Sequence, residues 1–432
     1  MNQAIGILVC TAFLGLPLDP AVAQELPALT LPQAREMALR NHPRITVADL
    51  KALAARQVAR EARAAYLPNV SANVVAVGTA DNNTRLAAVG ALNNPAIFDR
   101  NAEGLMVTQL ITDFGRTANL IGSARLRAES EANNAQAARE QILLAVDGAF
   151  YSAAEAHSVT RVAQQTVSTR QTFLDQVSAL ASNKLRSDLD VSFAKVNLED
   201  ARLLLSRAQN DLQASFAQLS TLLGQREPKD YRLIEQSLPP AVSTNLSEYV
   251  QQALSRRPDL ISAREQQEAA VRFAKAERAA RYPTIAAVGS AGVVPIHDSE
   301  LPDNYAAAGV VLNLPLYAGG LYSARQKEAE LQAEASAAAV RDLEDSAIRD
   351  VRIAWLNTQN AFDRYRISGQ LLENARQSYD LAQARYKAGL SSIVELNQAE
   401  LNRVSAEISY TTTQYEYLTQ RSALSFQTGT LR

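Results

Sequence analysis

Histidines and one short acidic pair are the side chains of this sequence that could bind a metal ion or transfer protons. The three histidines, His42, His157 and His297, are widely separated, and none has a carboxylate or cysteine at ligand spacing. Asp188 and Asp190 could give two oxygens to a calcium ion, but no further oxygen ligands follow at the required spacing. A Gly-rich phosphate loop is also missing. We therefore expect no enzyme activity, no bound metal and no cofactor.

The composition is that of a folded chain without special bias. Of the 432 residues, 47% are hydrophobic and 20% are charged, which excludes a collagen-like fibre and a low-complexity disordered chain. The 43 lysines and arginines against 45 aspartates and glutamates give a net charge of -2. Because no basic surplus is available to neutralise a phosphate backbone, we expect no nucleic-acid partner.

The N-terminus has the features of a secretion signal. The apolar run from Ala4 to Leu16 is too short to cross a bilayer core, and Ala21-Val22-Ala23 is a small-residue cleavage pattern. We therefore interpret residues 1–23 as a signal peptide. Cys10, the only cysteine, would be removed with it, which suits an oxidising periplasm. A lipid anchor on Cys10 is the alternative, although the preceding Val9 is bulky for such a site.

The remaining chain contains two copies of one unit. The pattern Leu31-x6-Ala38-Leu39-x3-Pro43 recurs as Leu246-x6-Ala253-Leu254-x3-Pro258, and the match continues to the C-terminus with a deletion in one loop of the second copy. We place the first repeat at 24–240 and the second at 241–432.

Helix-capping sequences and prolines define the first elements of each unit. Capping-box sequences at 30–33 and 245–248 predict helices that run to about residues 65 and 280. Pro68 and Pro283 then end these helices, because proline lacks the amide proton of the backbone. Gly-, Val- and Ala-rich segments follow and predict four strands, paired as two hairpins. The predicted strands span 69–78, 104–112, 284–294 and 305–316, with polar loops holding Asn82-Asn83 and Asp298-Ser299.

Very long helices follow each hairpin. The segments 116–181 and 321–388 contain no proline, and each would be about 100 Å long. In the second, small residues recur every seven positions, which predicts close coiled-coil packing. Arg170 alone breaks the corresponding line in the first. Shorter helices return to about residue 223 and over 392–428, so that two helices of about 50 Å would lie end to end along each long helix. The small residues are Ala347, Ala354, Ala361, Ser368, Ala375 and Ala382.

These elements predict a mainly α fold with a small β part. Four strands per chain cannot close, and unpaired edge groups facing lipid cost several kcal/mol each. If the strands cross a membrane, several chains must share one barrel, and three chains would supply twelve strands. Strands packed as a soluble cap are the alternative.

The order of motifs on both copies resembles the TolC-like outer membrane efflux protein family, also called outer membrane factors. The resemblance rests on these segments: Tyr66-Leu67-Pro68, Arg281-Tyr282-Pro283, Asp113-Phe114-Gly115-Arg116, Leu316-Tyr317-Ala318-Gly319-Gly320, Tyr386-Lys387-Ala388-Gly389 and Ser425-Phe426-Gln427-Thr428-Gly429. It implies a homotrimer with a 12-stranded transmembrane β-barrel above a periplasmic α-helical tunnel. It also implies docking to a periplasmic adaptor and an inner-membrane pump of the RND or ABC class.

The resemblance further implies a gate at the periplasmic tip. Glu395 matches the first acidic residue of the family's constriction, Gln398 occupies the second position and is neutral, and Asp190 matches the acidic residue after the first turn. Tyr386 matches an aromatic gate residue, and Ser391 replaces a basic residue of the second turn. Three symmetric Glu395 carboxylates would favour cations, whereas the simpler interpretation is that Glu395 and Asp190 are solvated residues at helix N-termini. The implied adaptor contacts are Lys184, Leu185 and Ser187 in the first turn, which lacks the family's glycine, and Lys387, Gly389 and Ser391 in the second.

The sequence therefore favours an outer-membrane channel of a Gram-negative bacterium with a long periplasmic portion, acting as a passive gated exit duct in efflux or type I secretion. A periplasmic coiled-coil scaffold or adaptor with a soluble β cap is the alternative. The sequence does not identify the transported substrate or the energy source of the pump.

Overall fold

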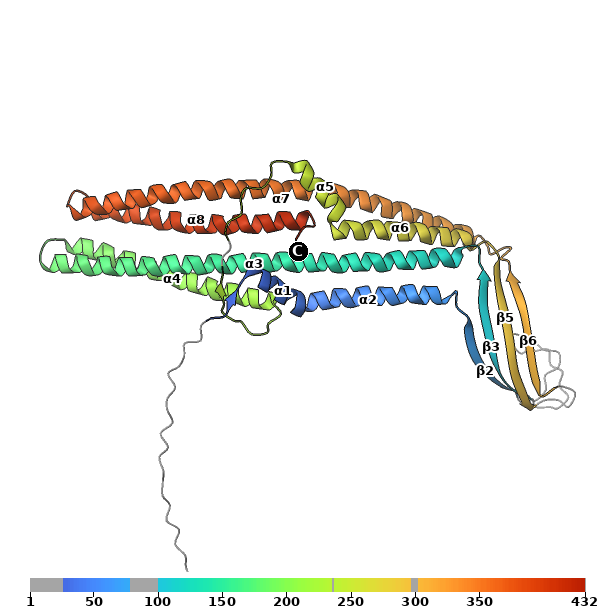
Figure 1. Cartoon of the computed structure of the whole chain (residues 1–432). Helices are drawn as coiled ribbons and strands as arrows, with labels where there is room; N and C mark the ends of the chain where they lie inside the picture. The colour runs from blue at the N-terminus through green and yellow to red at the C-terminus, as the bar shows by residue number, and fades with distance from the viewer. Residues whose placement is uncertain (1–25, 78–99, 235–236, 297–301, 432) are drawn as a thin grey trace, which may run out of the picture.

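The computed structural model describes residues 26–77, 100–234, 237–296 and 302–431 (Figure 1). The predicted signal peptide with Cys10, the polar loop residues 82–83 and 298–299, and His297 lie outside the described residues. The elements along the chain are β1 (Ala28–Leu29), α1 (Leu31–Asn41), α2 (Pro43–Ala64), β2 (Asn69–Val77), β3 (Arg100–Thr112), α3 (Arg116–Ser182), α4 (Asp188–Leu222), β4 (Arg232–Leu233), α5 (Leu246–Arg256), α6 (Pro258–Ala279), β5 (Thr284–Ile296), β6 (Asn304–Asn313), α7 (Leu321–Lys387) and α8 (Ile393–Gln427).

The two repeats have helices of equal length. Helices α1 and α5 have 11 residues each, α2 and α6 have 22, α3 and α7 have 67, and α4 and α8 have 35. This agreement confirms the mainly helical, duplicated architecture that the sequence predicts.

Each long helix carries two shorter ones along its length. In Figure 1, α2 and α4 lie end to end along α3, with α1 between them, and α6, α5 and α8 are arranged in the same way along α7. The predicted small-residue seam of α7 is buried, with Ala347 fully covered. The repeats join along α3, which packs against both α6 and α8. Among the described residues, no helix is both long and apolar enough to span a membrane.

The first helix of each repeat is divided at a proline. His42 and Arg257 leave the helical conformation, with ψ of 123° and 120°, and Pro43 and Pro258 start the next helix. The C-terminal ends of α4 and α8 pack against these bends. A Cβ on Gly224 would lie 2.8 Å from Asn41, and one on Gly429 would lie 2.8 Å from the Arg256 backbone. Only glycine fits these two contacts.

One predicted capping box is wrong. Thr30 forms the expected box, donating its amide to Gln33 Oε1 at 3.0 Å and accepting the Gln33 amide at 3.4 Å. Asn245 begins α5 as predicted but makes no side-chain cap to the helix. Its Oδ1 instead accepts the Ser247 hydroxyl at 2.7 Å, and its ψ of 88° differs from the ψ of 157° at the capping residue Thr30.

Four of the strands form one antiparallel sheet in the order β2-β3-β5-β6, and the two-residue strands β1 and β4 pair in parallel in a separate sheet. Both predicted hairpins are confirmed, and β3 joins β5 across the repeats, as in the pairing of Thr108 with Val288. The fourth strand ends at Asn313, three residues earlier than predicted, because Pro315 cannot continue the hydrogen-bonded ladder. Strand β3 begins earlier than predicted, at Arg100. Strands β2 and β6 form the two edges, and neither has a second partner strand among the described residues.

Candidate gate at the helical tip

The two turns predicted to form the tip lie together at the end of the molecule opposite the sheet (Figure 1). Both close in the same way: the Leu185 amide donates to the Leu180 carbonyl at 2.9 Å, and the Leu390 amide donates to the Arg385 carbonyl at 2.8 Å. Lys184 has a φ of 58° where Gly389 has a φ of 74°. The first turn thus adopts the glycine-type conformation without a glycine, at a cost of roughly 1–2 kcal/mol.

Serines cap the helices that leave both turns. The Ser187 hydroxyl accepts the Asp190 amide at 3.2 Å, and the Asp190 carboxylate accepts the Ser187 amide at 3.2 Å. The Ser392 hydroxyl likewise accepts the Glu395 amide at 3.3 Å. Both acidic residues therefore lie in a first helical turn, where the helix dipole favours a negative charge. Asp190 has a capping role whether or not it also acts on ions.

Glu395 is exposed and paired with an arginine. The Arg385 Nε lies 3.2 Å from a Glu395 carboxylate oxygen, so the charge is partly neutralised within its own hairpin. Gln398 is also exposed and donates from Nε2 to Asn402 Oδ1 at 3.0 Å. Sequence reasoning missed Arg385, because nothing in its spacing from Glu395 indicates contact across a turn.

Tyr386 is buried and lies against an arginine of the other repeat. The Arg186 guanidinium carbon is 4.2 Å from the Tyr386 ring centroid, and Arg186 Nη2 donates to the Tyr386 carbonyl at 3.0 Å. Phe173 of α3 packs on the same ring with a centroid distance of 5.8 Å. Burial raises the pKa of the Tyr386 phenol, an effect that Arg186 opposes and Asp190 reinforces. The Tyr386 hydroxyl is buried and has no hydrogen-bond partner among the described residues.

The other predicted turn residues face outward. Lys184, Leu185, Ser187, Lys387 and Gly389 are exposed. Leu185 and the equivalent Leu390 expose 69% and 70% of their surface, so the tip presents two apolar side chains to solvent. Ser391 is half-buried, and its hydroxyl has no hydrogen-bond partner within the described chain.

A buried ion pair joins the repeats above the tip. Arg170, the predicted break in the apolar seam of α3, has its Nε 3.6 Å from Glu400 Oε1 of α8. Their side chains are only 5% and 9% exposed. Arg170 also donates to the Asn197 carbonyl of α4. Arg170, which interrupts the apolar heptad line of α3, therefore forms a charged joint that connects α3, α4 and α8.

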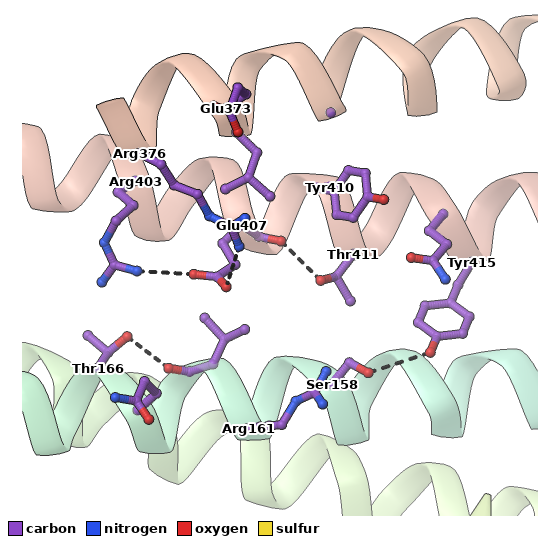
Figure 2. Close-up of a pocket in the computed structure, with 15 residues that line it drawn as sticks. Ser158, Arg161, Thr166, Glu373, Arg376, Arg403, Glu407, Tyr410, Thr411 and Tyr415 are labelled. Atoms are coloured by element: carbon purple, nitrogen blue, oxygen red, sulfur yellow. Dashed lines mark hydrogen bonds and ion pairs between the residues drawn. The ribbon is translucent and has the colours of Figure 1, made fainter. Parts of the chain in front are cut away.

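A polar cleft of about 560 Å³ opens next to this joint, between α3, α7 and α8. Figure 2 shows Glu407 among the lining residues, with Arg376 and Arg403 reaching its carboxylate at 3.3 and 3.2 Å. On the α3 side, Ser158 and Tyr415 share a hydrogen bond of 3.5 Å. Sequence reasoning missed this cleft because its charged residues come from helices far apart in the chain.

Solved structures with this architecture include outer-membrane channels. The chain aligns with CusC, a protein whose crystal structures concern transmembrane channel formation, with a TM-score of 0.78, 20% identity and coverage of 92% of both chains. It aligns with the outer membrane protein VceC from Vibrio cholerae with a TM-score of 0.76 and 20% identity, covering 92% of this chain and 96% of that one. The fold is that of the outer-membrane channel proteins.

The chain belongs to the outer membrane efflux protein family, whose model matches residues 34–225 and 249–430. Curated relatives include the outer membrane protein OprJ of Pseudomonas aeruginosa, 25% identical over 87% of this chain and 78% of that protein. They also include TolC of Escherichia coli, 21% identical over 94% and 83% of the two chains. The alkaline protease secretion protein AprF of Pseudomonas aeruginosa is 24% identical over 94% and 85%. The predicted family is confirmed, and the protein is an outer-membrane channel protein of the efflux and secretion class.

Proposed function

We propose that three copies of this chain enclose one pore, as a passive gated exit duct for substrates driven by an inner-membrane pump. The observation that carries the proposal is the sheet with two open edges, β2 and β6. Edge amides and carbonyls facing lipid cost several kcal/mol each, so the edges need partners. Adjacent strands are all antiparallel, and β6 of one copy can therefore meet β2 of the next with the same alternation. Three copies would form a closed barrel of twelve strands in the outer-membrane lipid.

Exposed apolar stripes on the outer helices support the same arrangement. The helices of the tip half lie in the order α4, α3, α8, α7, so α4 and α7 are outermost. Helix α4 exposes Leu189, Val196 and Leu203 at intervals of one heptad, and α7 exposes Ile353, Ile367 and Leu381 in heptad register. Apolar heptads indicate packing against another helix. In the trimer, α7 of one copy would cover α4 of the next and close a periplasmic tunnel.

The partners follow from the class of protein. Relatives carry names such as efflux pump outer membrane protein TtgC of Pseudomonas putida and the secretion protein AprF. By analogy, this chain would receive substrate from a periplasmic adaptor and an RND or ABC pump. Exposed Leu185 and Leu390 support the two turns, with Lys184, Ser187, Lys387, Gly389 and Ser391, as the adaptor contact. The energy comes from the pump, so this chain needs no catalytic residue, metal or cofactor.

The gate would lie at the tip, where Tyr386, Asp190, Glu395 and Gln398 from the three copies approach the axis. The repeat limits of 24–240 and 241–432 and the signal peptide at 1–23 stay predictions. Each family-model match falls inside one of the two repeats, which supports the division.

Planar lipid bilayers test the proposal. The purified full-length protein should produce discrete current steps of low conductance, because the proposed gate would keep the resting tip narrow. A protein that fractionates with the soluble periplasm and leaves bilayers electrically silent would instead support the scaffold alternative.

A further inference from the structure

We propose that Tyr305 determines the width of the barrel lumen near its outer end, and that Gly104 and Gly292 form a seat that keeps this ring out of the passage. The inference rests on the proposed function as a duct of three copies, and it identifies a residue that sets the largest solute able to leave. Tyr305 is the only aromatic residue in the four strands β2, β3, β5 and β6.

The Tyr305 side chain reaches across two strands. The register places Asn73, Gly104, Gly292 and Tyr305 in one row across β2, β3, β5 and β6. Side chains directly opposite one another lie on the same face of a sheet, and neighbouring strands are about 4.8 Å apart. A Cβ on Gly292 would lie 2.7 Å from the Tyr305 hydroxyl oxygen, and a Cβ on Gly104 would overlap that oxygen. The side chain therefore lies flat along the sheet, over β5, with its hydroxyl above β3.

The two glycines have different reasons to lack a side chain. At Gly292, a Cβ would also overlap the Glu103 carbonyl of β3, so the backbone itself requires glycine there. At Gly104, a Cβ would lie 3.0 Å from the Ala291 carbonyl and 3.1 Å from Cζ of Tyr305, and the overlap is with the far end of the tyrosine. Gly104 is thus the position where an added methyl group acts mainly on the Tyr305 ring.

Tyr305 lies on the more polar face of the sheet, because its row includes Asn73. Strand β2 alternates between polar residues on this face and apolar residues on the other. The polar residues are Asn69, Ser71 and Asn73, and the apolar residues are Val70, Ala72 and Val74. Polar residues of the other face lie toward the strand ends, and they are Glu103, Gln109 and Asn304. Membrane barrels turn their apolar residues to lipid, so Tyr305 would face the lumen.

The row of Tyr305 lies in the half of the sheet away from the helices. Tyr305 is the second residue of β6, which starts at the end of the sheet farthest from α2 and α3 (Figure 1). Side chains of strands usually stand roughly perpendicular to the sheet. Without the glycine seat, three Tyr305 rings would therefore project into the passage close to its exit and reduce its width.

The rate of labelling of a thiol in the lumen tests the inference. Cys10 precedes the predicted mature start, so Ser290→Cys would supply the only thiol of the mature chain. Ser290 pairs with Ala307, one row deeper than Tyr305 on the same face. Membrane-impermeant maleimides of graded size, added outside intact cells, must pass the Tyr305 row to reach it. Labelling is measured on the full-length protein that is recovered as an assembled oligomer.

In the Ser290→Cys protein, Gly104→Ala should slow labelling by the largest maleimides roughly tenfold and change labelling by the smallest less than about twofold. Addition of Tyr305→Ala should restore the rate, because the methyl group then has no ring to displace. Gly309→Ala is the matched control. It adds a methyl group on the same face of β6, where a Cβ would have no atom within 4 Å, and should leave the rates unchanged.

If Gly104→Ala prevents assembly, Gly104→Ala with Tyr305→Phe takes its place. This pair lacks the overlapping oxygen and should slow the largest maleimides to an intermediate extent. Assembled variants that label at the rate of Gly309→Ala, or slow labelling that persists without the Tyr305 ring, would overturn the role of Tyr305 and leave the duct intact. A Ser290→Cys protein that reacts no faster than Ala291→Cys, on the opposite face, would instead overturn the proposed barrel.

Discussion

Replacing Glu400 with leucine should weaken the joint between the repeats, because it leaves Arg170 as a buried charge without its counter-ion. The two side chains are 5% and 9% exposed, and Arg170 Nε lies 3.6 Å from the Glu400 carboxylate.

The magnitude follows from burial. Removal of one partner of a buried ion pair typically costs about 3–5 kcal/mol. Replacement of both partners should be close to neutral, because Arg170 occupies a seam position where neighbouring turns carry apolar residues such as Ala163 and Val177. We therefore expect Arg170→Leu with Glu400→Leu to recover most of the stability that Glu400→Leu loses.

Thermal unfolding of the purified protein, followed by its helical circular dichroism, measures the effect. Because the entropy of unfolding grows with chain length, a loss of 3–5 kcal/mol in this chain corresponds to a fall of about 3–6 °C in midpoint. A single variant that melts with the wild type, or a double variant that melts below the single one, would refute this account of the joint.

Three further predictions concern the tip and the corner of the first repeat. Glu395→Gln should reduce cation selectivity and block by divalent ions, and unchanged reversal potentials would argue against an acidic constriction. Lys184→Gly should slow hydrogen exchange of the first turn, because relief of about 1–2 kcal/mol of backbone strain exceeds the added freedom of glycine in the unfolded chain; faster exchange would contradict this. Burial, reinforced by Arg44, lowers the pKa of His42, whose Nδ1 accepts the Arg44 amide at 3.2 Å. The unfolded chain therefore takes up this proton first, and the stability that His42 provides should fall as pH drops below about 6.5, a dependence that His42→Asn should remove.

Local signals predicted the elements of this fold well. Pro68 and Pro283 mark the ends of the first helices, and Gly389 marks the turn after α7, because these residues act on the backbone within one turn. Because the sequence is repeated, the same order of elements could be predicted in both halves of the chain. The failures are also local: the Asn245 side chain accepts the Ser247 hydroxyl and does not cap α5, and Pro315 shortens β6.

Contacts between the repeats were beyond the reach of local patterns. The pairing of β3 with β5 and the ion pair of Arg170 with Glu400 join residues that are distant in the chain. Arg170 was visible only as a break in an apolar line, and a sequence pattern does not identify the residue that compensates it. Arg186 was overlooked for a similar reason, since the resemblance directed attention to a basic residue in the second turn.

The number of chains in one pore tests the central claim most directly. The only cysteine, Cys10, precedes the predicted mature start, so thiols introduced at the exposed edge residues Val74 of β2 and Val310 of β6 would be the only ones in the mature chain. In outer membranes, a short thiol-specific cross-linker acting on the Val74→Cys, Val310→Cys double variant should give a covalent ladder that ends at the trimer, while each single variant stays monomeric. A double variant that remains monomeric, or a ladder that ends at the dimer, would contradict the shared barrel.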